Sequence, residues 1–123
     1  MQDLVASAQQ RAFWLTNEID PGTPVFNLLR VLRLQGTLHK HSLVRAFDDL
    51  IVRHEVLRTG LVERNGVILQ HVHDEISFVI EEQDFSSLSE SDRRMQMDTL
   101  VARMCQTAFD LAVPPHLHDG NPD

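Results

Sequence analysis

The amino-acid sequence predicts a mixed α/β fold, of the α+β kind with a mixed sheet. Apolar residues recur at helical spacing in three stretches, and two other stretches are rich in Val, Ile, Leu and Phe. An Asn-Gly pair also divides an apolar run into two predicted strands. The predicted order is therefore α-β-α-β-β-β-α. With 123 residues and no repeat or low-complexity tract, we expect residues 1–123 to form a single unit with one modest core.

The first helix is predicted over about residues 4–18, where apolar side chains recur at helical spacing. Ser7 followed by Gln10 has the spacing of a capping box. The stretch "DPGTP" (20–24) ends this helix, because proline lacks the amide that a helix needs and glycine favours a turn. Residues 25–35 are apolar on both alternating faces, which predicts a strand covered on both sides.

A second helix is predicted over about residues 40–58, with one apolar stripe that includes His54. Gly60 suits the end of this helix. Asn65 and Gly66 lie between two apolar runs, and this pair is the strongest short signal for a β-hairpin because both turn residues need positive φ.

The last third of the chain predicts one more strand and a third helix. Residues 76–82 alternate apolar and polar side chains, which predicts a half-buried strand. Apolar residues return at helical spacing over about residues 90–109, and Pro114 and Pro115 end that helix.

The composition narrows the classes of function. Eleven basic and 18 acidic residues give a net charge of −7, which argues against nucleic acid as a partner. The most apolar run is interrupted by Arg30 and Arg33 and is too short to span a bilayer, so we expect no membrane partner. Cys105 stands alone and is expected to be a small buried hydrophobe. The absence of a signal peptide predicts a cytoplasmic location.

The histidines form three H-x-H pairs, and we predict no metal site from them. Only the middle pair lies on a predicted strand, where residues two apart share a face, and no cysteine accompanies it. A closed metal site needs about four ligands. The stretch "HLHDG" (116–120) follows two prolines and is typical of a solvated terminus. The three pairs are His39 and His41, His71 and His73, and His116 and His118.

The stretch "RHEVLRTG" (53–60) is dense in groups that take part in catalysis elsewhere. Glu55 and Arg58 are three apart and can pair along a helix, while His54 falls on the apolar stripe and is expected to be a core histidine. Arginines also suit the negative end of a helix dipole. No nucleophile is evident within reach of the histidine, so the residues alone indicate a charged helix end.

Two stretches resemble known signature motifs. "ASAQQRAFWL" (6–15) and "RHEVLRTGL" (53–61) resemble the first two motifs of the condensation domains of nonribosomal peptide synthetases. "DFSSL" (84–88) and "AFDLA" (108–112) resemble later landmarks of that family. The resemblance covers about residues 4–115. The chain departs from the first two motifs at Ala6, Ala12, Phe13 and Leu61.

The resemblance implies the N-terminal part of a chloramphenicol acetyltransferase-like fold. It also implies a parent reaction, the formation of an amide bond between acyl and aminoacyl groups carried on the phosphopantetheine thioesters of carrier proteins. The family's catalytic motif, HHxxxDG, lies downstream of the "FDLA" landmark and is not found in this sequence. We therefore expect this N-terminal fragment to be inactive on its own, with no catalytic residue, no directly bound cofactor and no metal.

The resemblance implies a supporting role for the motif residues. Among them, Arg58 is expected to be the most important for the architecture. Two alternatives remain open: a fragment of a related acyltransferase, and a non-catalytic module that binds a synthetase or carrier protein. An unpaired edge of the predicted strand 25–35 would also favour self-association and low stability. The supporting residues implied by the motifs are Gln9, Arg11, Arg53, His54, Glu55, Arg58 and Thr59.

Overall fold

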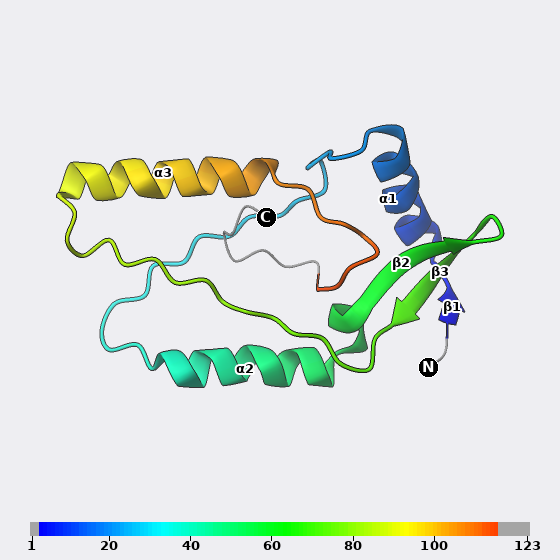
Figure 1. Ribbon diagram of the computed structural model, residues 1–123, viewed down its shortest axis with the longest axis horizontal. Coiled ribbons are helices and arrows are strands. Elements are labelled where there is room, and N and C mark those ends of the chain that lie inside the picture. Colours follow the sequence, from blue (N-terminus) through cyan, green and yellow to red (C-terminus); the bar gives the residue numbers. More distant parts are fainter. Residues whose placement is uncertain (1–2, 116–123) are drawn as a thin grey trace.

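The computed structural model describes residues 3–115, which form a three-stranded antiparallel sheet and three helices. The order is β1 (Asp3–Val5), α1 (Ala8–Ile19), α2 (Lys40–Arg53), the 3-10 helix η1 (Glu55–Arg58), β2 (Thr59–Arg64), β3 (Val67–Val72) and α3 (Glu90–Gln106). The sheet and α1 lie at one end of the molecule, and α2 and α3 lie along opposite long sides (Figure 1). The mixed α/β class is confirmed, although the order of its elements differs from the prediction.

The sheet is built around the predicted hairpin. Asn65 and Gly66 have φ values of 52° and 78°, so both take the positive φ that a tight hairpin turn needs. Beyond this turn, Arg64 pairs with Val67 and the two strands stay in register to Thr59 opposite Val72. The strand β3 is the central strand, with β2 on one side and β1 on the other.

The first helix begins later than predicted. Residues 3–5 form β1, which pairs with β3 in the register Leu4 opposite Gln70. The helix starts after Ser7, whose side chain accepts from the amide of Gln10 at 3.1 Å, while the Gln10 side chain accepts from the Ser7 amide at 2.8 Å. The capping box is thus confirmed. Pairing with a strand some 65 residues away overrode the local helical pattern of the first residues.

The prediction of the second helix, over residues 40–58, is wrong beyond residue 53, where α2 ends. His54 has φ −113° and ψ 105°, an extended conformation that ends α2, and a short 3-10 turn follows it. The side chain of Arg58 donates to the carbonyl of Ile51 at 3.0 Å. Because the carbonyls at a helix end have no partner within the helix, this bond supports an early end to α2.

The two other predicted strands, residues 25–35 and 76–82, are not strands in the structure. Both segments run as coil between α2 and α3 (Figure 1). No backbone hydrogen bond joins residues 28–35 or 76–80 to another backbone group within residues 3–115. A strand requires a neighbour for its amides and carbonyls, and the local pattern alone does not provide one.

The third helix ends at Gln106, three residues earlier than predicted. Ser89 caps its beginning by accepting from the amide of Asp92 at 3.2 Å. At its other end, Thr107 is extended, and its amide donates to the carbonyl of Arg103. Cys105 on this helix is exposed, so the expectation of a buried cysteine is wrong. No helix within residues 3–115 is long and apolar enough to cross a membrane.

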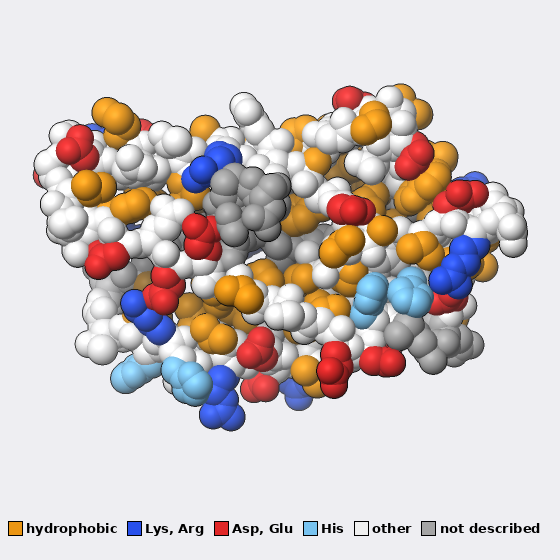
Figure 2. Space-filling view, viewed as in Figure 1, with side chains coloured by type: hydrophobic (Ala, Val, Ile, Leu, Met, Phe, Trp, Pro, Cys, Tyr) orange, Lys and Arg blue, Asp and Glu red, His pale blue; other side chains and the backbone are white. Residues whose placement is uncertain are grey.

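The core is small and takes one residue from α2 and one from each strand of the hairpin. Ile51, Leu61 and Ile68 are the buried large hydrophobic residues of the described chain. Many other large apolar side chains are exposed, and patches of them are visible over the surface in Figure 2. The best-packed part of the molecule is therefore the region around the "RTGL" sequence at the start of β2.

Candidate functional site

The guanidinium of Arg58 lies at the centre of the candidate site. It donates to the carbonyl of Ile51 at 3.0 Å and to the carbonyl of His73 at 2.7 Å, with longer contacts to the carbonyls of Val52 and Asp74 at 3.4 and 3.5 Å. The two shorter bonds, to Ile51 and His73, join the end of α2 to the residue after β3. A planar group with several fixed donors can bridge two chain segments in this way, and a lysine ammonium cannot reproduce that geometry.

Thr59 makes a buried hydrogen bond next to Arg58. Its side chain is 7% exposed, and its hydroxyl donates to the carbonyl of Glu55 at 2.7 Å. The backbone carbonyl of Arg58 accepts from the amide of His73 at 2.8 Å, so the main chain and the side chain of Arg58 both contact His73. The turn between α2 and β2 is thus held by a hydrogen bond within it, from Thr59 to Glu55, and by hydrogen bonds to His73.

The later landmark "AFDLA" (108–112) packs directly against β2. The amide of Leu61 donates to the carbonyl of Leu111 at 2.7 Å. A Cβ atom on Gly60 would collide with the carbonyl oxygen of Ala112 and lie 2.9 Å from the carbonyl carbon, so only glycine allows this approach. We call residues 58–61, with their contacts to α2, His73 and residues 110–112, the RTGL junction. It brings together two motifs that are some 50 residues apart in the sequence.

The other predicted support residues lie outside this junction. Gln9 and Arg11 are exposed on α1, and Arg53, His54 and Glu55 are exposed near the end of α2. The expected burial of His54 in the core is wrong because α2 ends before it. No ion pair joins Glu55 to Arg58, since the guanidinium of Arg58 turns toward backbone carbonyls instead. Of the predicted support residues, the structure places Arg58 and Thr59 in one packed junction.

Sequence reasoning missed a hollow between α1, residues 23–30 and the end of α3. It has a volume of about 890 Å³ and is lined mainly by apolar side chains, with Gln9 among the polar ones. Phe13 and Phe26 contact each other there with their ring centroids 4.4 Å apart. The contributing segments are separated in sequence and carry no shared motif, so no local pattern indicated the hollow.

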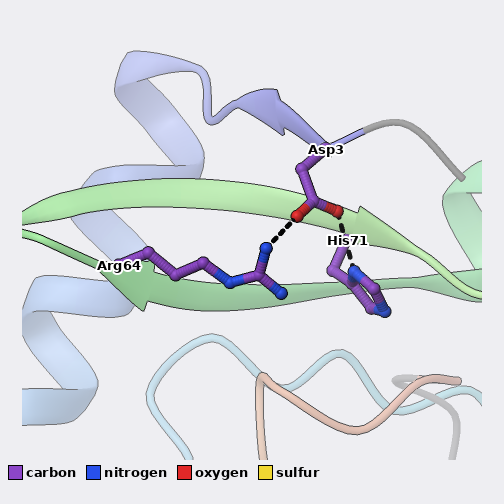
Figure 3. Close-up of polar contacts among 3 residues, drawn as sticks. All are labelled: Asp3, Arg64 and His71. Atoms are coloured by element: carbon purple, nitrogen blue, oxygen red, sulfur yellow. Dashed lines mark hydrogen bonds and ion pairs between the residues drawn. The ribbon is translucent and has the colours of Figure 1, made fainter.

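A second polar cluster joins β1 to the hairpin (Figure 3). Asp3 contacts Nδ1 of His71 through Oδ1 at 2.8 Å, and its Oδ2 accepts from Arg64. The hydrogen bond from His71, followed by the positive charge of Arg64, holds the pKa of Asp3 below its usual value despite partial desolvation. No local pattern indicated this cluster, because its members are 61 and 68 residues apart.

The histidines do not assemble into a metal site in the described chain. His71 and His73 have their ring centroids 4.8 Å apart, and Nε2 of His73 is buried without a hydrogen-bond partner among the described residues. Within residues 3–115, no three His, Cys, Asp or Glu side chains lie close enough to hold a metal ion. The stretch "HLHDG" lies outside the described residues. Asp3 can fix the orientation of the His71 ring, but no hydroxyl or thiol of the described residues is hydrogen-bonded to that ring.

Comparison with known proteins identifies the family. The condensation domain model matches residues 2–118. One of the chains of linear gramicidin synthase from Brevibacillus parabrevis is 32% identical over 108 residues, which cover 88% of this chain and 2% of that protein. Phosphinothricin tripeptide synthetase PhsC from Streptomyces viridochromogenes is 32% identical over 111 residues, covering 90% of this chain and 10% of that protein. One of the chains of plipastatin synthase from Bacillus subtilis is 41% identical over 78 residues, which cover 63% of this chain and 2% of that protein.

The fold also matches a solved structure. The starter condensation domain of rhizomide synthetase, in complex with C8-CoA, superimposes with a TM-score of 0.75 at 18% sequence identity. The match covers 92% of this chain and 26% of that chain, so the present chain spans only a small part of its relatives. The fold expected from the motifs is thereby confirmed. With the family model matching nearly the whole chain, the protein belongs to the condensation domain family of nonribosomal peptide synthetases.

Proposed function

We propose that this chain supplies the N-terminal portion of a condensation domain, whose reaction forms an amide bond between two carrier-bound substrates. In that reaction the amine nitrogen of one substrate attacks the thioester carbonyl of the other. The carbon–sulfur bond breaks, and the thiol leaves with the proton that the amine loses. The observation that carries this proposal is the family match over residues 2–118 together with the packing of its two matching motifs in the RTGL junction.

The role proposed for this chain is structural support of the catalytic region. The hydrogen bond from Leu61 to Leu111 holds the "AFDLA" segment against β2. In the family, the histidine motif follows this landmark along the chain. The junction would therefore fix the point from which the polypeptide continues toward the catalytic histidines. Arg58 is the main positioning residue because it joins α2 to the end of β3.

The substrates and partners follow from the same proposal. The acyl groups would arrive as phosphopantetheine thioesters on carrier proteins, and the remainder of a synthetase would be the immediate partner in the cytoplasm. The chain itself would bind no cofactor directly. Alone, it would not catalyse amide formation, since the residues of the RTGL junction hold backbone groups and offer no general base to a substrate.

A chimeric enzyme tests the proposal. Residues 3–115 would replace the matching part of a complete condensation domain of linear gramicidin synthase, and amide formation would be followed with aminoacyl carrier proteins. A folded chimera that forms the amide product supports the proposal. A chimera that folds, binds both carrier proteins and forms no product would overturn it and favour a non-catalytic binding module.

The Arg58→Ala variant of the chimera tests the positioning role. A shift of about 1 Å in a catalytic group can lower the rate by ~100-fold. We therefore expect a fall in kcat of about tenfold to a hundredfold, with little change in KM, and only partial recovery in Arg58→Lys. The matched control is Arg53→Ala, which removes an exposed arginine near the same helix end and should keep the kcat. Equal effects of Arg53→Ala and Arg58→Ala on kcat would contradict the role.

A further inference from the structure

The side chain of Asn27 joins two segments that lie far apart in the sequence. Its Nδ2 donates to the carbonyl of Thr107 at 2.5 Å, across 80 residues, and the bond is partly buried. It connects the coil after α1 to the end of α3 (Figure 1). The landmark "AFDLA" begins at the residue after Thr107. Asn27 therefore holds the chain at the point where it enters this landmark.

The donor is held in place by its own neighbours. The amide of Asn27 donates to the carbonyl of Pro24 at 2.8 Å and closes a tight turn over residues 24–27. Phe26, the residue before it, contacts Phe13 of α1 with the ring centroids 4.4 Å apart. A group whose backbone is already ordered loses little further conformational freedom when it forms a hydrogen bond. The turn and the first motif thus place the side-chain amide of Asn27.

The acceptor is a backbone carbonyl just beyond the end of α3. The amide and the hydroxyl of Thr107 both donate to the carbonyl of Arg103, at 3.1 and 2.8 Å. Thr107 itself is extended, with ψ of 116°, and ends the helix. Because no later turn of helix follows, no helical amide is available for the carbonyl of Thr107. The side chain of Asn27 takes the place of that donor.

The same landmark segment is also held at its far end. There, in the RTGL junction, the amide of Leu61 donates to the carbonyl of Leu111 at 2.7 Å. Thr107 and Leu111 are four residues apart, a span of at most about 14 Å in an extended chain. A short segment is therefore attached at both ends, to the coil after the first motif through Asn27 and to the second motif through Leu61.

We propose that Asn27 is a positioning residue of the condensation reaction and sets the direction in which the "AFDLA" segment leaves α3. The inference rests on the proposed function, in which this segment leads toward the catalytic histidines. One attachment, at Leu111, leaves the segment free to turn about that point, whereas a second attachment at Thr107 fixes its direction. Asn27 would act through the backbone of Thr107 and not on a substrate. Displacing a catalytic group by about 1 Å can lower the rate by ~100-fold.

The same substitution at two positions of the chimera tests the role. Asn27→Asp keeps the shape of the side chain but turns a carboxylate, which only accepts, toward the carbonyl of Thr107. We expect kcat to fall about tenfold while the KM for either carrier protein stays nearly unchanged. The matched control is Asn17→Asp, which adds the same charge and should keep the kcat. Asn17 lines the same hollow and is partly buried, but its side chain is hydrogen-bonded to none of residues 3–115.

A double variant separates positioning of the segment from a general loss of stability. Gly60→Ala disturbs the other end of the segment, because a Cβ atom there collides with the backbone of Ala112. If both ends hold one segment, combining Gly60→Ala with Asn27→Asp should lower the kcat of the folded chimera by less than the product of the two separate factors. Effects that multiply fully would indicate two independent sites and overturn the proposal.

Hydrogen exchange gives a measurement that does not depend on turnover. The amides of Ala112 and Val113 bond to Asp110 and should exchange faster in Asn27→Asp, whereas Asn17→Asp should leave them protected. If the parent chimera is active and the two variants have equal kcat, the role of Asn27 is overturned and the proposed function stands. A fall in kcat without faster exchange would also overturn the role. A folded parent that forms no product would overturn both.

Discussion

The RTGL junction and the segment of residues 28–34 lie in the same small chain but differ in how their groups are paired. In the junction, the side chains of Thr59 and Leu61 are buried, the Arg58 side chain donates to a carbonyl of α2, and the backbone bonds to β3, His73 and Leu111. In the segment of residues 28–34, leucines lie in solvent and the backbone has no partner among the described residues. The difference shows that similar apolar sequences gain structure only where a second segment covers them.

The largest expected effect contrasts a buried leucine with an exposed one. Leu61→Ala removes a side chain that is 6% exposed and should lower the free energy of unfolding by about 3 kcal/mol. Leu28→Ala should change it by less than about 0.5 kcal/mol, because this side chain is already in solvent. Urea denaturation measures both changes in the free energy of unfolding. Similar losses in the free energy of unfolding for the two variants would contradict the contrast between the buried junction and the exposed segment.

Gly60→Ala addresses the close contact within the junction. A Cβ atom there would collide with the backbone of Ala112, and moving that backbone away should lower the free energy of unfolding by about 2 kcal/mol. Hydrogen exchange gives a local measurement, since the amide of Leu61 should lose protection when its bond to Leu111 is broken. If that amide stays protected and stability is unchanged, the contact between β2 and residues 110–112 is not part of the folded chain.

Thr59→Val and Thr99→Val compare the loss of a buried hydrogen bond with the loss of an exposed one. The variant keeps the shape of the side chain but removes its bond to the carbonyl of Glu55, and we expect a loss of about 1 kcal/mol in the free energy of unfolding. Thr99→Val removes a similar bond, to the carbonyl of Met95, on the exposed surface of α3. This control should leave stability nearly unchanged, because water replaces the lost partner. Equal losses would show that burial at Thr59 is unimportant.

The smallest effect is a dependence on pH at β1. The folded chain holds the pKa of Asp3 below 3.8, so the stabilisation from its contacts with His71 and Arg64 is present above pH 3.8. It is lost as the pH falls through the lower pKa of the folded chain. Hydrogen exchange of the β1 amides should show this loss. Asp3→Asn should abolish the pH dependence, whereas Asp98→Asn on α3 should leave it intact.

Sequence reasoning succeeded where the structural signal is local. The capping box at Ser7, the hairpin turn at Asn65 and Gly66, and the amphipathic stripe of α2 all depend on neighbours within a few residues. The motifs around Arg58 also indicated the family. The supporting role that the resemblance implies stays a prediction: Arg58 and Thr59 pack in the RTGL junction, whereas Glu55 and His54 make none of the contacts expected of them.

Reasoning from local patterns failed where distant segments decide the outcome. Residues 25–35 have the composition of a buried strand, but a strand exists only if another strand shares its hydrogen bonds, and no strand of the described residues pairs with this range. Conversely, residues 3–5 pair with β3 although they continue a helical pattern. The partners of Asp3 also could not be read from its neighbours, since they lie on the hairpin far along the chain.

By itself, the sequence determined the α/β class, the hairpin turn, the starts of α2 and α3, and the family, because these depend on local spacing and on the motifs themselves. Only the tertiary structure decided that α2 ends at Arg53, that Arg58 binds carbonyls and not Glu55, and that residues 28–34 stay unpaired within the described chain. The physical reason is common to all three. Backbone and side-chain hydrogen-bonding groups take whichever partners the folded chain brings near them, and those partners lie outside any local pattern.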